Sequence, residues 1–373
     1  MRFEVSKVLD AIERRLSTDP ATARAVVDLA EVVRYADFDN GRPANMLRLG
    51  QLIDALGRSV AEENVPVYVI VHRGLLSDAD LTSNERMVAR RWADDGLVEV
   101  LADPADRLLE VAELLGLPVL SRNRFDGLRG RYQWLGQPGR LLAPLPGHGG
   151  PALVARSGGG ATAPVSVDPS PDGAQLLVRL WHCPDPDCAL FGRMRVGRPG
   201  GQPPPTLRTG RPTCPRHGER LAETGPRPPA EVLSIRVDGS VRQRFVVSAD
   251  HPVVVGRAPE RGEGIMLGQW LTEEARRWIS RSHVRFELHG TELVVQDVST
   301  NGTGVRPGGS MDDEERRTIK RQARPLLPAD VVELYPGVHI ARSRVWATGG
   351  VSNPSSVMAD APTMSIRTVN RPG

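Results

Sequence analysis

Three short runs in the last third of the chain carry side chains that suit a multiply charged oxyanion. The candidate residues are Arg257, Ser280, Arg281, Thr300 and Asn301. A guanidinium can place two parallel hydrogen bonds on a phosphate, and hydroxyl groups can donate further bonds. A side-chain amide has both donors and an acceptor, so it can hold the main chain of a peptide. Together these groups predict a site for a phosphate group that is carried on an extended peptide.

The segments around these residues predict a β-meander whose loops present them. Residues 283–288 and 292–296 alternate bulky and polar side chains, and Gly290-Thr291 lies at the turn between them. Residues 269–279 predict a short helix that begins after Thr272 and leads into Ser280. Residues 311–324 are highly charged and predict a solvated surface helix.

The three runs follow the pattern G-R, then S-x-x-H, then D-x-S-x-N-G-T, in this order. This pattern resembles the forkhead-associated (FHA) domain, a β-sandwich that reads phosphothreonine, over roughly residues 231–346. The resemblance implies that Arg257 and Ser280 hold the phosphate with help from Arg281 and Thr300, and that Asn301 orients the peptide backbone. The alternatives are an FHA fold that does not bind, and chance co-occurrence of the three motifs.

The C-terminal residues 349–373 are polar and predict a disordered tail. The tail holds Thr363, followed three residues later by Ile366. Many FHA domains read a phosphothreonine together with an aliphatic residue at this spacing. We therefore hypothesise that phosphorylated Thr363 docks into the FHA pocket of the same or a neighbouring chain, which implies self-association.

All three cysteines of the chain lie in one segment with a histidine. The spacings are C-x4-C and C-x2-H, which are typical of two knuckles around a tetrahedral zinc ion. The predicted ligands are Cys183, Cys188, Cys214 and His217. Four such ligands leave no open position, so the zinc would be structural. The segment resembles zinc ribbons, which bind nucleic acid or protein; the alternatives are unrelated surface thiols and a ligand role for His182.

The first 140 residues alternate apolar strand-like runs with amphipathic segments, which predicts a parallel sheet covered by helices on both faces. The predicted strands are residues 25–29, 65–72, 97–102 and 117–121. The predicted helices are residues 1–20, 43–63, 83–95 and 103–115.

Polar side chains follow these strands, at the edge where sites in such sheets lie. The candidates are Asp28, Asp106, Asn123 and Asp126. Carboxylates gathered there can hold Mg²⁺ or Mn²⁺ for phosphodiester hydrolysis. The arrangement resembles the PIN-like/NYN ribonucleases, but Glu31 replaces an Asn of that family and Asn123 stands where the family has a metal-binding Asp. An active nuclease, an inactive PIN-like binding module and another α/β domain remain open. An Asp before a helix is also an ordinary N-cap.

The composition of the chain bears on its linkers, its partners and its cellular location. The chain has 373 residues, with 38 Gly and 32 Pro that concentrate between positions 138 and 229. Residues 141–174 therefore predict a flexible linker. A net charge of +3 gives no strong case for nucleic acid. The absence of a signal peptide or a long apolar run, with only three cysteines, predicts a cytoplasmic protein with no membrane partner.

These observations predict a multidomain chain. Its parts are a PIN-like α/β domain (residues 1–140), a linker (141–174), a zinc-ribbon-like segment (175–225), an FHA domain (231–348) and a tail (349–373). We interpret it as a phosphothreonine-binding adaptor that acts after a Ser/Thr kinase, with nucleic acid kept as a further partner class. The alternative is a metal-dependent ribonuclease that the FHA domain targets.

Overall fold

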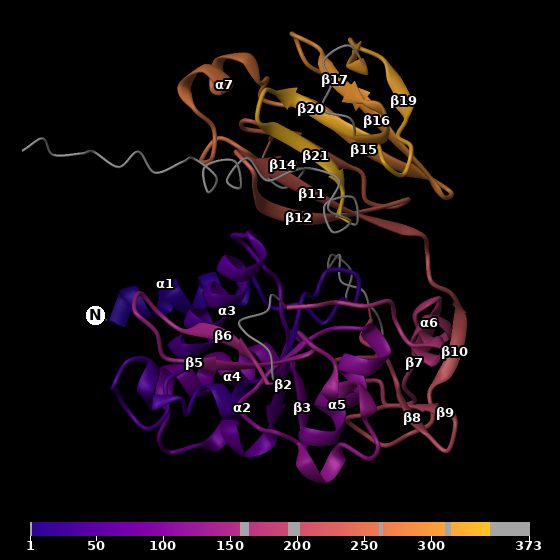
Figure 1. Ribbon diagram of the computed structural model, residues 1–373. Coiled ribbons are helices and arrows are strands. Elements are labelled where there is room, and N and C mark those ends of the chain that lie inside the picture. The colour runs from indigo at the N-terminus through magenta and orange to yellow at the C-terminus, as the bar shows by residue number, and fades with distance from the viewer. Residues whose placement is uncertain (1, 157–163, 193–201, 261–263, 310–314, 344–373) are drawn as a thin grey trace, which may run out of the picture. The chain divides into compact units, whose positions relative to one another are not determined.

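The structure is a computed structural model that describes residues 2–156, 164–192, 202–260, 264–309 and 315–343 (Figure 1). The chain divides into two compact units. The first is Met1–Val232 together with Val241–Pro252 and Leu288–Thr291. The second is Leu233–Ser240, Val253–Glu287 and Glu292–Gly373. The tail residues Thr363 and Ile366 lie outside the described residues, so their proposed docking stays a hypothesis.

The first unit contains a six-stranded sheet with the order β3-β2-β1-β4-β5-β6. The strands are β1 (Val26–Asp28), β2 (Tyr68–His72), β3 (Glu99–Leu101), β4 (Val119–Leu120), β5 (Leu141–Leu145) and β6 (Ala152–Ala155). The first five are parallel, and β6 runs antiparallel to β5. The predicted parallel sheet is confirmed. The strand order reverses between β1 and β4, and open α/β sheets bind ligands at such a point.

Helices cover both faces of this sheet, as predicted. They are α1 (Arg2–Glu13), α2 (Leu29–Val32), α3 (Leu47–Val60), α4 (Ser83–Asp94) and α5 (Ala105–Leu115). Val27 belongs to a core that includes side chains of α1, α3 and α4, whereas its neighbour Val26 belongs to a second core with α5. Successive strand residues point to opposite faces, so an apolar run supplies both cores at once.

Local sequence signals set the helix ends. Thr82 and Glu85 form a reciprocal capping box at the start of α4. Gly116 ends α5 with a φ of 68°, a conformation that a residue with a Cβ adopts at a cost. Helix α1 ends at Glu13, earlier than the predicted boundary near residue 20.

The linker predicted for residues 141–174 is wrong for much of its length. Strand β5 pairs with β4 in parallel, β6 returns beside it, and α6 (Pro171–Leu177) follows. The glycine-rich stretch at 147–150 is the turn of the β5–β6 hairpin rather than a spacer. Composition showed only a glycine- and proline-rich stretch, because the parallel pairing of β5 depends on a strand that lies 21 residues earlier.

The cysteine-bearing segment belongs to the first unit. Its strands are β7 (Arg179–His182), β8 (Thr206–Arg208), β9 (Arg211–Thr213) and β10 (Ala222–Pro226), paired as β10–β7 and β8–β9. The three cysteines share a buried core with Trp181 and Phe191 and with Leu114 of α5. The segment is therefore packed against the N-terminal sheet's own helix.

A buried ionic network reinforces this packing. Arg107 on α5 pairs with Glu99 and with Glu110, each at 2.7 Å. Its guanidinium also donates to the carbonyl of Pro204 at 2.5 Å, and the Glu110 carboxylate accepts from the Leu207 amide at 2.9 Å. Burial alone would lower the pKa of Arg107, but the charges of Glu99 and Glu110 outweigh it and raise that pKa. Removing one member would leave an uncompensated buried charge, which is strongly destabilising.

The described residues from Ala230 onward form two β-sheets with the orders β12-β11-β21-β20-β17-β18 and β14-β13-β15-β16-β19. Residues alternate between buried and half-exposed along β15 and β16, as the sequence predicted. One face of each strand therefore points into the core, as in a β-sandwich. The first sheet holds β11 (Ala230–Val237), β12 (Ser240–Ser248), β17 (Thr303–Arg306), β18 (Arg317–Ile319), β20 (Val331–Tyr335) and β21 (Val338–Arg342). The second holds β13 (Val253–Gly256), β14 (Gly264–Met266), β15 (Val284–His289), β16 (Glu292–Asp297) and β19 (Ala323–Pro325).

Two helices were predicted in the second unit, and only one is present among its described residues. Helix α7 (Glu273–Trp278) begins after Thr272, whose hydroxyl accepts from the Ala275 amide, as predicted. The helix predicted for residues 311–324 is wrong from Arg317 onward, because β18 and β19 occupy this stretch; residues 311–314 lie outside the described residues. Pairing with β17 and β16 overrides the helical propensity of the charged side chains.

No helix of the described residues has the length and apolar character needed to cross a membrane.

Candidate functional site

Gly256, the last residue of β13, allows two loops to meet. A Cβ at this position would stand 2.1 Å from the carbonyl oxygen of Arg281. The next amide, that of Arg257, donates to the carbonyl of Ser280 at 3.0 Å. Only glycine permits this approach, which holds the backbone of the exposed residue Arg257 against the loop that carries Ser280.

Ser280 holds the centre of this site. Its Oγ accepts a hydrogen bond from the amide of Thr300 at 3.1 Å, and its own amide donates to Nδ1 of His283 at 3.0 Å. A hydroxyl group has two acceptor lone pairs and one donor. Since Thr300 uses one acceptor position, the O–H of Ser280 stays available to donate to an anion.

His283 is fully buried beneath the loop. Its Nδ1 accepts from Ser280, so the neutral ring carries its proton on Nε2, which lies 3.3 Å from the carbonyl oxygen of Gly302. Burial lowers the pKa of His283, against smaller raising effects of Asp297 and Gly302. The ring is therefore neutral near pH 7 and joins the Ser280 loop to the Gly302 loop, which agrees with the architectural role that the resemblance implies.

Asp297 stabilises the loop of residues 299–303 through hydrogen bonds. The sequence pattern had not been interpreted in this way. Its carboxylate accepts from Ser299 Oγ at 2.7 Å, from Thr303 Oγ1 at 2.5 Å and from the Arg321 amide at 2.8 Å. Burial raises the pKa of Asp297, but the bonds from Thr303, Arg321 and Ser299 outweigh it and hold that pKa below its usual value. The D-x-S-x-N-G-T pattern was the available signal, because its first, third and seventh residues make these hydrogen bonds.

Thr300 and Asn301 are exposed at the tip of the loop of residues 299–303. The Asn301 amide nitrogen donates to the carbonyl of Trp278, at the end of α7, at 2.7 Å. Its carbonyl oxygen and second N–H are then available for a ligand. The structure thus brings the loops of Arg257, Ser280-Arg281 and Thr300-Asn301 together through hydrogen bonds. Whether all five side chains bind an anion stays a prediction.

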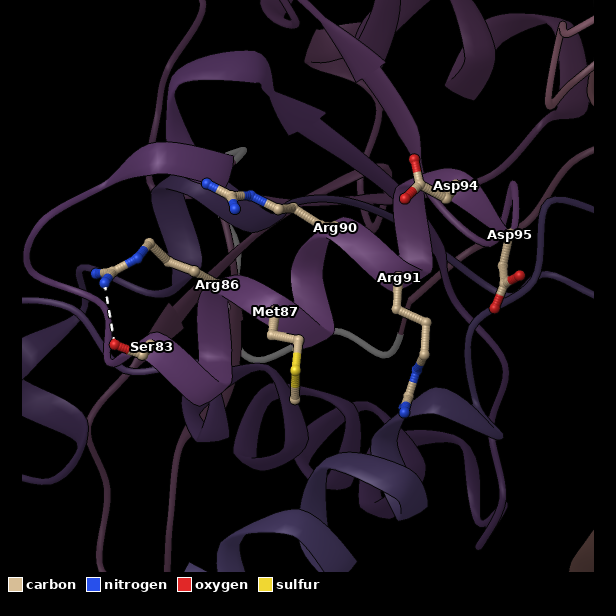
Figure 2. A pocket seen from close by; sticks show the side chains of 7 residues that line it. All are labelled: Ser83, Arg86, Met87, Arg90, Arg91, Asp94 and Asp95. Atoms are coloured by element: carbon tan, nitrogen blue, oxygen red, sulfur yellow. Dashed lines mark hydrogen bonds between the residues drawn. The ribbon is translucent and has the colours of Figure 1, made fainter.

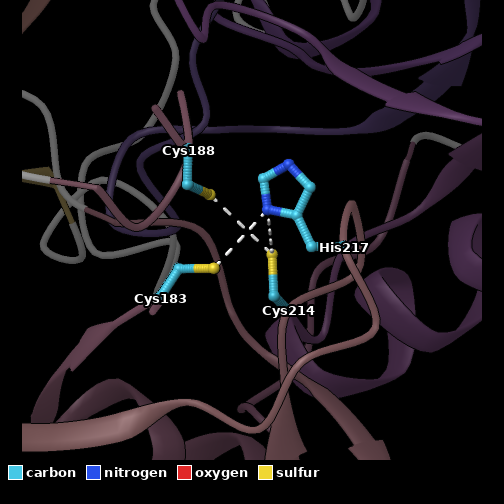
Figure 3. A group of neighbouring side chains, drawn as sticks. All are labelled: Cys183, Cys188, Cys214 and His217. Carbon is cyan, nitrogen blue, oxygen red and sulfur yellow. Dashed lines mark hydrogen bonds between the residues drawn. The ribbon is translucent and has the colours of Figure 1, made fainter. Parts of the chain in front are cut away.

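The second candidate site is the predicted metal site, and its four residues converge (Figure 3). Their ligand atoms lie within 4.8 Å of one another, and no other such group of three or more His, Cys, Asp or Glu occurs in the parts of the chain that are described. Cys188 Sγ lies 3.8 Å from Cys214 Sγ, and Cys183 Sγ lies 3.5 Å from His217 Nδ1. Bonds of ~2.3 Å to a tetrahedral zinc would separate two sulfurs by about 3.8 Å. This group can hold a metal ion.

The two knuckles have the turns that such a site needs. The Phe191 amide donates to the ligand atom Cys188 Sγ at 3.3 Å, and the Gly218 amide closes the second turn by donating to the Cys214 carbonyl at 2.8 Å. Gly218 has a φ of 73°, which favours glycine. All three cysteines are buried and His217 is half-buried, so solvent has little access to the ligands.

The polar residues at the strand ends of the N-terminal sheet do not assemble in the predicted way. The Asp106 carboxylate accepts two bonds from Arg131, at 2.7 and 2.8 Å, and one from the Tyr132 hydroxyl at 3.1 Å. Asp126 pairs with Arg129 at 3.0 Å, with 72% of its side chain exposed. Asn123 accepts the Phe125 amide at 2.8 Å in a local turn. Asp28 caps α2 by accepting the Ala30 amide at 2.8 Å, which is the ordinary N-cap role. Their catalytic role stays a prediction from resemblance alone.

Glu31 is the residue that sequence reasoning passed over at this edge. Its carboxylate accepts from Ser121 Oγ at 2.6 Å and from the Arg122 amide at 2.8 Å, and it also receives the Tyr35 hydroxyl. It therefore ties the end of β1 to the end of β4. The sequence showed Glu31 only as a departure from a family motif, because Ser121 and Arg122, which it joins to β1, lie 90 and 91 residues away in the chain.

Asp28 has the one strongly perturbed carboxyl group described at this edge. Burial, followed by the nearby charge of Glu31, raises the pKa of Asp28 from 3.8 to about 6. A raised pKa means that the contribution of this group to stability is complete below pH 3.8 and is lost as the pH rises through about 6. At neutral pH the Asp28 charge thus opposes folding, as charges at binding sites often do.

We expect Asp28→Asn to stabilise the protein at pH 7.5 by about 2 kcal/mol, since Asn removes the charge and still caps a helix. The thermal unfolding midpoint of the first unit should rise by about 4–8 °C, and this gain should shrink as the pH is lowered to about 4. Scanning calorimetry of the full chain measures both. Asp126→Asn removes an exposed carboxylate and should change little. An unaltered midpoint for Asp28→Asn at pH 7.5 would contradict the raised pKa.

A surface pocket of about 490 Å³ lies along α4. Figure 2 shows its lining residues, which are Ser83, Arg86, Met87, Arg90, Arg91, Asp94 and Asp95. Its arginines are already engaged: Arg86 with the Leu81 carbonyl, Arg90 with the Leu76 carbonyl and Arg91 with Glu13. The pocket is open and its polar groups do not converge, so we assign no chemistry to it.

No protein-family model matches this chain, and no curated protein matches it either. Similar solved structures include the FHA domain of human APLF in complex with an XRCC1 bisphospho peptide (19% identity, TM-score 0.22, 29% of this chain and 96% of that chain). The FHA domain of CT664 from Chlamydia trachomatis is similar at 18% identity (TM-score 0.23, 30% and 95%). Mycobacterium tuberculosis EmbR in complex with a low affinity phosphopeptide is similar at 17% identity (TM-score 0.22, 34% and 26%). The functional conclusion therefore rests on the contacts between the loops.

Proposed function

We propose that the second unit is an FHA domain that binds phosphothreonine peptides, and that the chain is an adaptor recruited by the product of a Ser/Thr kinase. The hydrogen bond from the Thr300 amide to Ser280 Oγ is the observation that carries this proposal. It joins the two hydroxyl-bearing loops, while Arg257 is held beside them by the bond of its amide to Ser280. These loops together offer the guanidinium groups of Arg257 and Arg281, two hydroxyl groups and a side-chain amide to a single ligand.

The charges of these groups suit a phosphorylated residue. A phosphate monoester carries about −1.5 to −2 charges at neutral pH and three acceptor oxygens. Arg257 supplies the opposite charge, and the Ser280 and Thr300 hydroxyls supply donors without a charge of their own. Asn301 stands at the edge of this group, where a peptide main chain would pass. A threonine rather than a serine preference follows from the FHA resemblance.

Fluorescence anisotropy with the full chain tests this function. We expect labelled phosphothreonine peptides to bind, and the matched unphosphorylated and phosphoserine peptides to bind at least about 10-fold more weakly. Equal affinity for the phosphorylated and unphosphorylated forms would overturn the proposal.

We also propose that the Cys₃His group holds a structural zinc ion. The four ligands are of the types that zinc selects, and no further ligand position is left for a substrate. Such an ion would fix the two knuckles relative to each other and complete the core that they share with α5. The cysteine-bearing segment would then stabilise the first unit by packing against α5.

For the N-terminal sheet we propose a binding module of the PIN-like type. Its strand order and the polar strand ends support this interpretation, and the arginine pairs of Asp106 and Asp126 leave little carboxylate for a metal ion. The metal-dependent ribonuclease remains a prediction from the resemblance, and no contact among the described residues favours it.

A further inference from the structure

Helix α7 places a large apolar side chain at the rim of the proposed phosphopeptide site. Trp278 ends this helix, two residues before Ser280, and is 45% exposed. The helix itself is anchored, since Leu271, Ala275 and Ile279, at intervals of four residues, are all buried. The exposure of Trp278 therefore follows from its place on the helix and not from a loosely packed segment.

The backbone of Trp278 is part of the site's hydrogen-bond network. Its carbonyl oxygen accepts the Asn301 amide at 2.7 Å, and the Ile279 amide that follows it bonds back to Ala275. Asn301 is the side chain that we assign to the main chain of the peptide. A peptide held there passes within side-chain reach of Trp278.

We propose that Trp278 is a specificity-determining residue, and that its indole contacts an apolar side chain of the peptide close to the phosphothreonine. This inference rests on the proposed function of the site. An indole offers a wide, rigid apolar surface that loses little side-chain entropy on binding, and tryptophans are enriched among residues that dominate interfaces. The neighbouring charges do not favour an acidic peptide instead, because α7 carries Glu273 and Glu274 as well as Arg276 and Arg277.

A leucine scan of a phosphothreonine peptide tests this role. The reference peptide has alanine at every position around the phosphothreonine, and leucine is moved from three residues before it to three residues after it. For the wild-type chain we expect one position at which leucine strengthens binding by about 10-fold over alanine. In Trp278→Ala this ratio should fall below about 2, and in Trp278→Phe most of it should return. This ratio of leucine-peptide to alanine-peptide affinity stays informative even if Trp278→Ala displaces Asn301 and so weakens the binding of every peptide.

Met266→Ala is the matched control, because Met266 is another exposed apolar residue of the same unit, at the end of β14. It should keep the leucine preference. If Trp278→Ala keeps a ratio near 10, or if the wild type shows no leucine preference at any position, the inference is wrong while phosphothreonine binding stands. If the wild type does not distinguish phosphorylated from unphosphorylated peptides, both the inference and the proposed function are wrong.

Discussion

Replacing Arg257 by alanine will weaken phosphothreonine-peptide binding by about 100-fold or more. The backbone amide of Arg257 donates to the Ser280 carbonyl, so the Arg257 guanidinium starts from a backbone position next to the Ser280 loop. Charge-assisted hydrogen bonds contribute roughly 1.5–3 kcal/mol each, and a 100-fold change corresponds to about 2.7 kcal/mol. Anisotropy titrations of the full chain at fixed ionic strength measure this loss.

Two further variants separate the geometry of Arg257 from its charge. Arg257→Lys keeps the charge but not the planar fork, so we expect an intermediate loss of roughly 10-fold. Arg317→Ala removes an exposed arginine from β18 in the same unit and should leave affinity within about 2-fold. If Arg257→Ala and Arg317→Ala weaken binding equally, the loss reflects net charge, and the phosphate site lies elsewhere.

At the proposed zinc site, we expect Cys214→Ala to abolish zinc binding and to destabilise the first unit by several kcal/mol. Structural zinc contributes on the order of 10 kcal/mol of apparent folding free energy. The effect extends beyond the knuckles, because Cys214 lies in the same core as Leu114 of α5 and the segment is tied to Arg107. Zinc content by atomic emission and unfolding by scanning calorimetry measure the two consequences.

His182→Ala provides the control for the metal site. His182 neighbours Cys183 in the chain, but it is not one of the four residues that converge. This variant should retain one zinc ion per chain and most of the wild-type stability. Treatment of the wild type with a strong chelator should reproduce the Cys214→Ala result. Metal-free wild-type protein that unfolds at the same temperature as the zinc-bound form would contradict a structural role.

In the N-terminal unit, the sequence pattern predicted the sheet and its helices but not every strand pairing. The alternation of apolar runs with amphipathic segments predicted the parallel sheet and both of its helical layers. It could not show that β5 extends the sheet, because the pairing of Leu142 with β4 is decided by the surface that β4 presents. It also could not show that Glu31 bonds to Ser121 at the point where the strand order reverses.

In the candidate sites, too, the sequence predicted some features and the tertiary structure decided others. The order of Gly256-Arg257, Ser280-x-x-His283 and Asn301-Gly302 was enough to predict which loops would meet, and the spacing of the cysteines predicted the Cys₃His group. The tertiary structure supplied the reasons, which are the absence of room for a Cβ at Gly256 beside the Arg281 carbonyl and the hydrogen bonds that Asp297 accepts. It also supplied Trp278, which had no role in the sequence pattern because an exposed tryptophan becomes meaningful only through its neighbours.

The sequence by itself thus determined the features that depend on a few consecutive residues. These are the Thr272 cap, the turn at Gly290, the two cysteine-bearing turns and the order of the motifs that we propose to bind phosphate. Only the tertiary structure decided the features that join distant segments. The strands β18 and β19 replaced a predicted helix, and Asp28 acquired a raised pKa, because cross-strand hydrogen bonds and burial depend on partners that no local window contains.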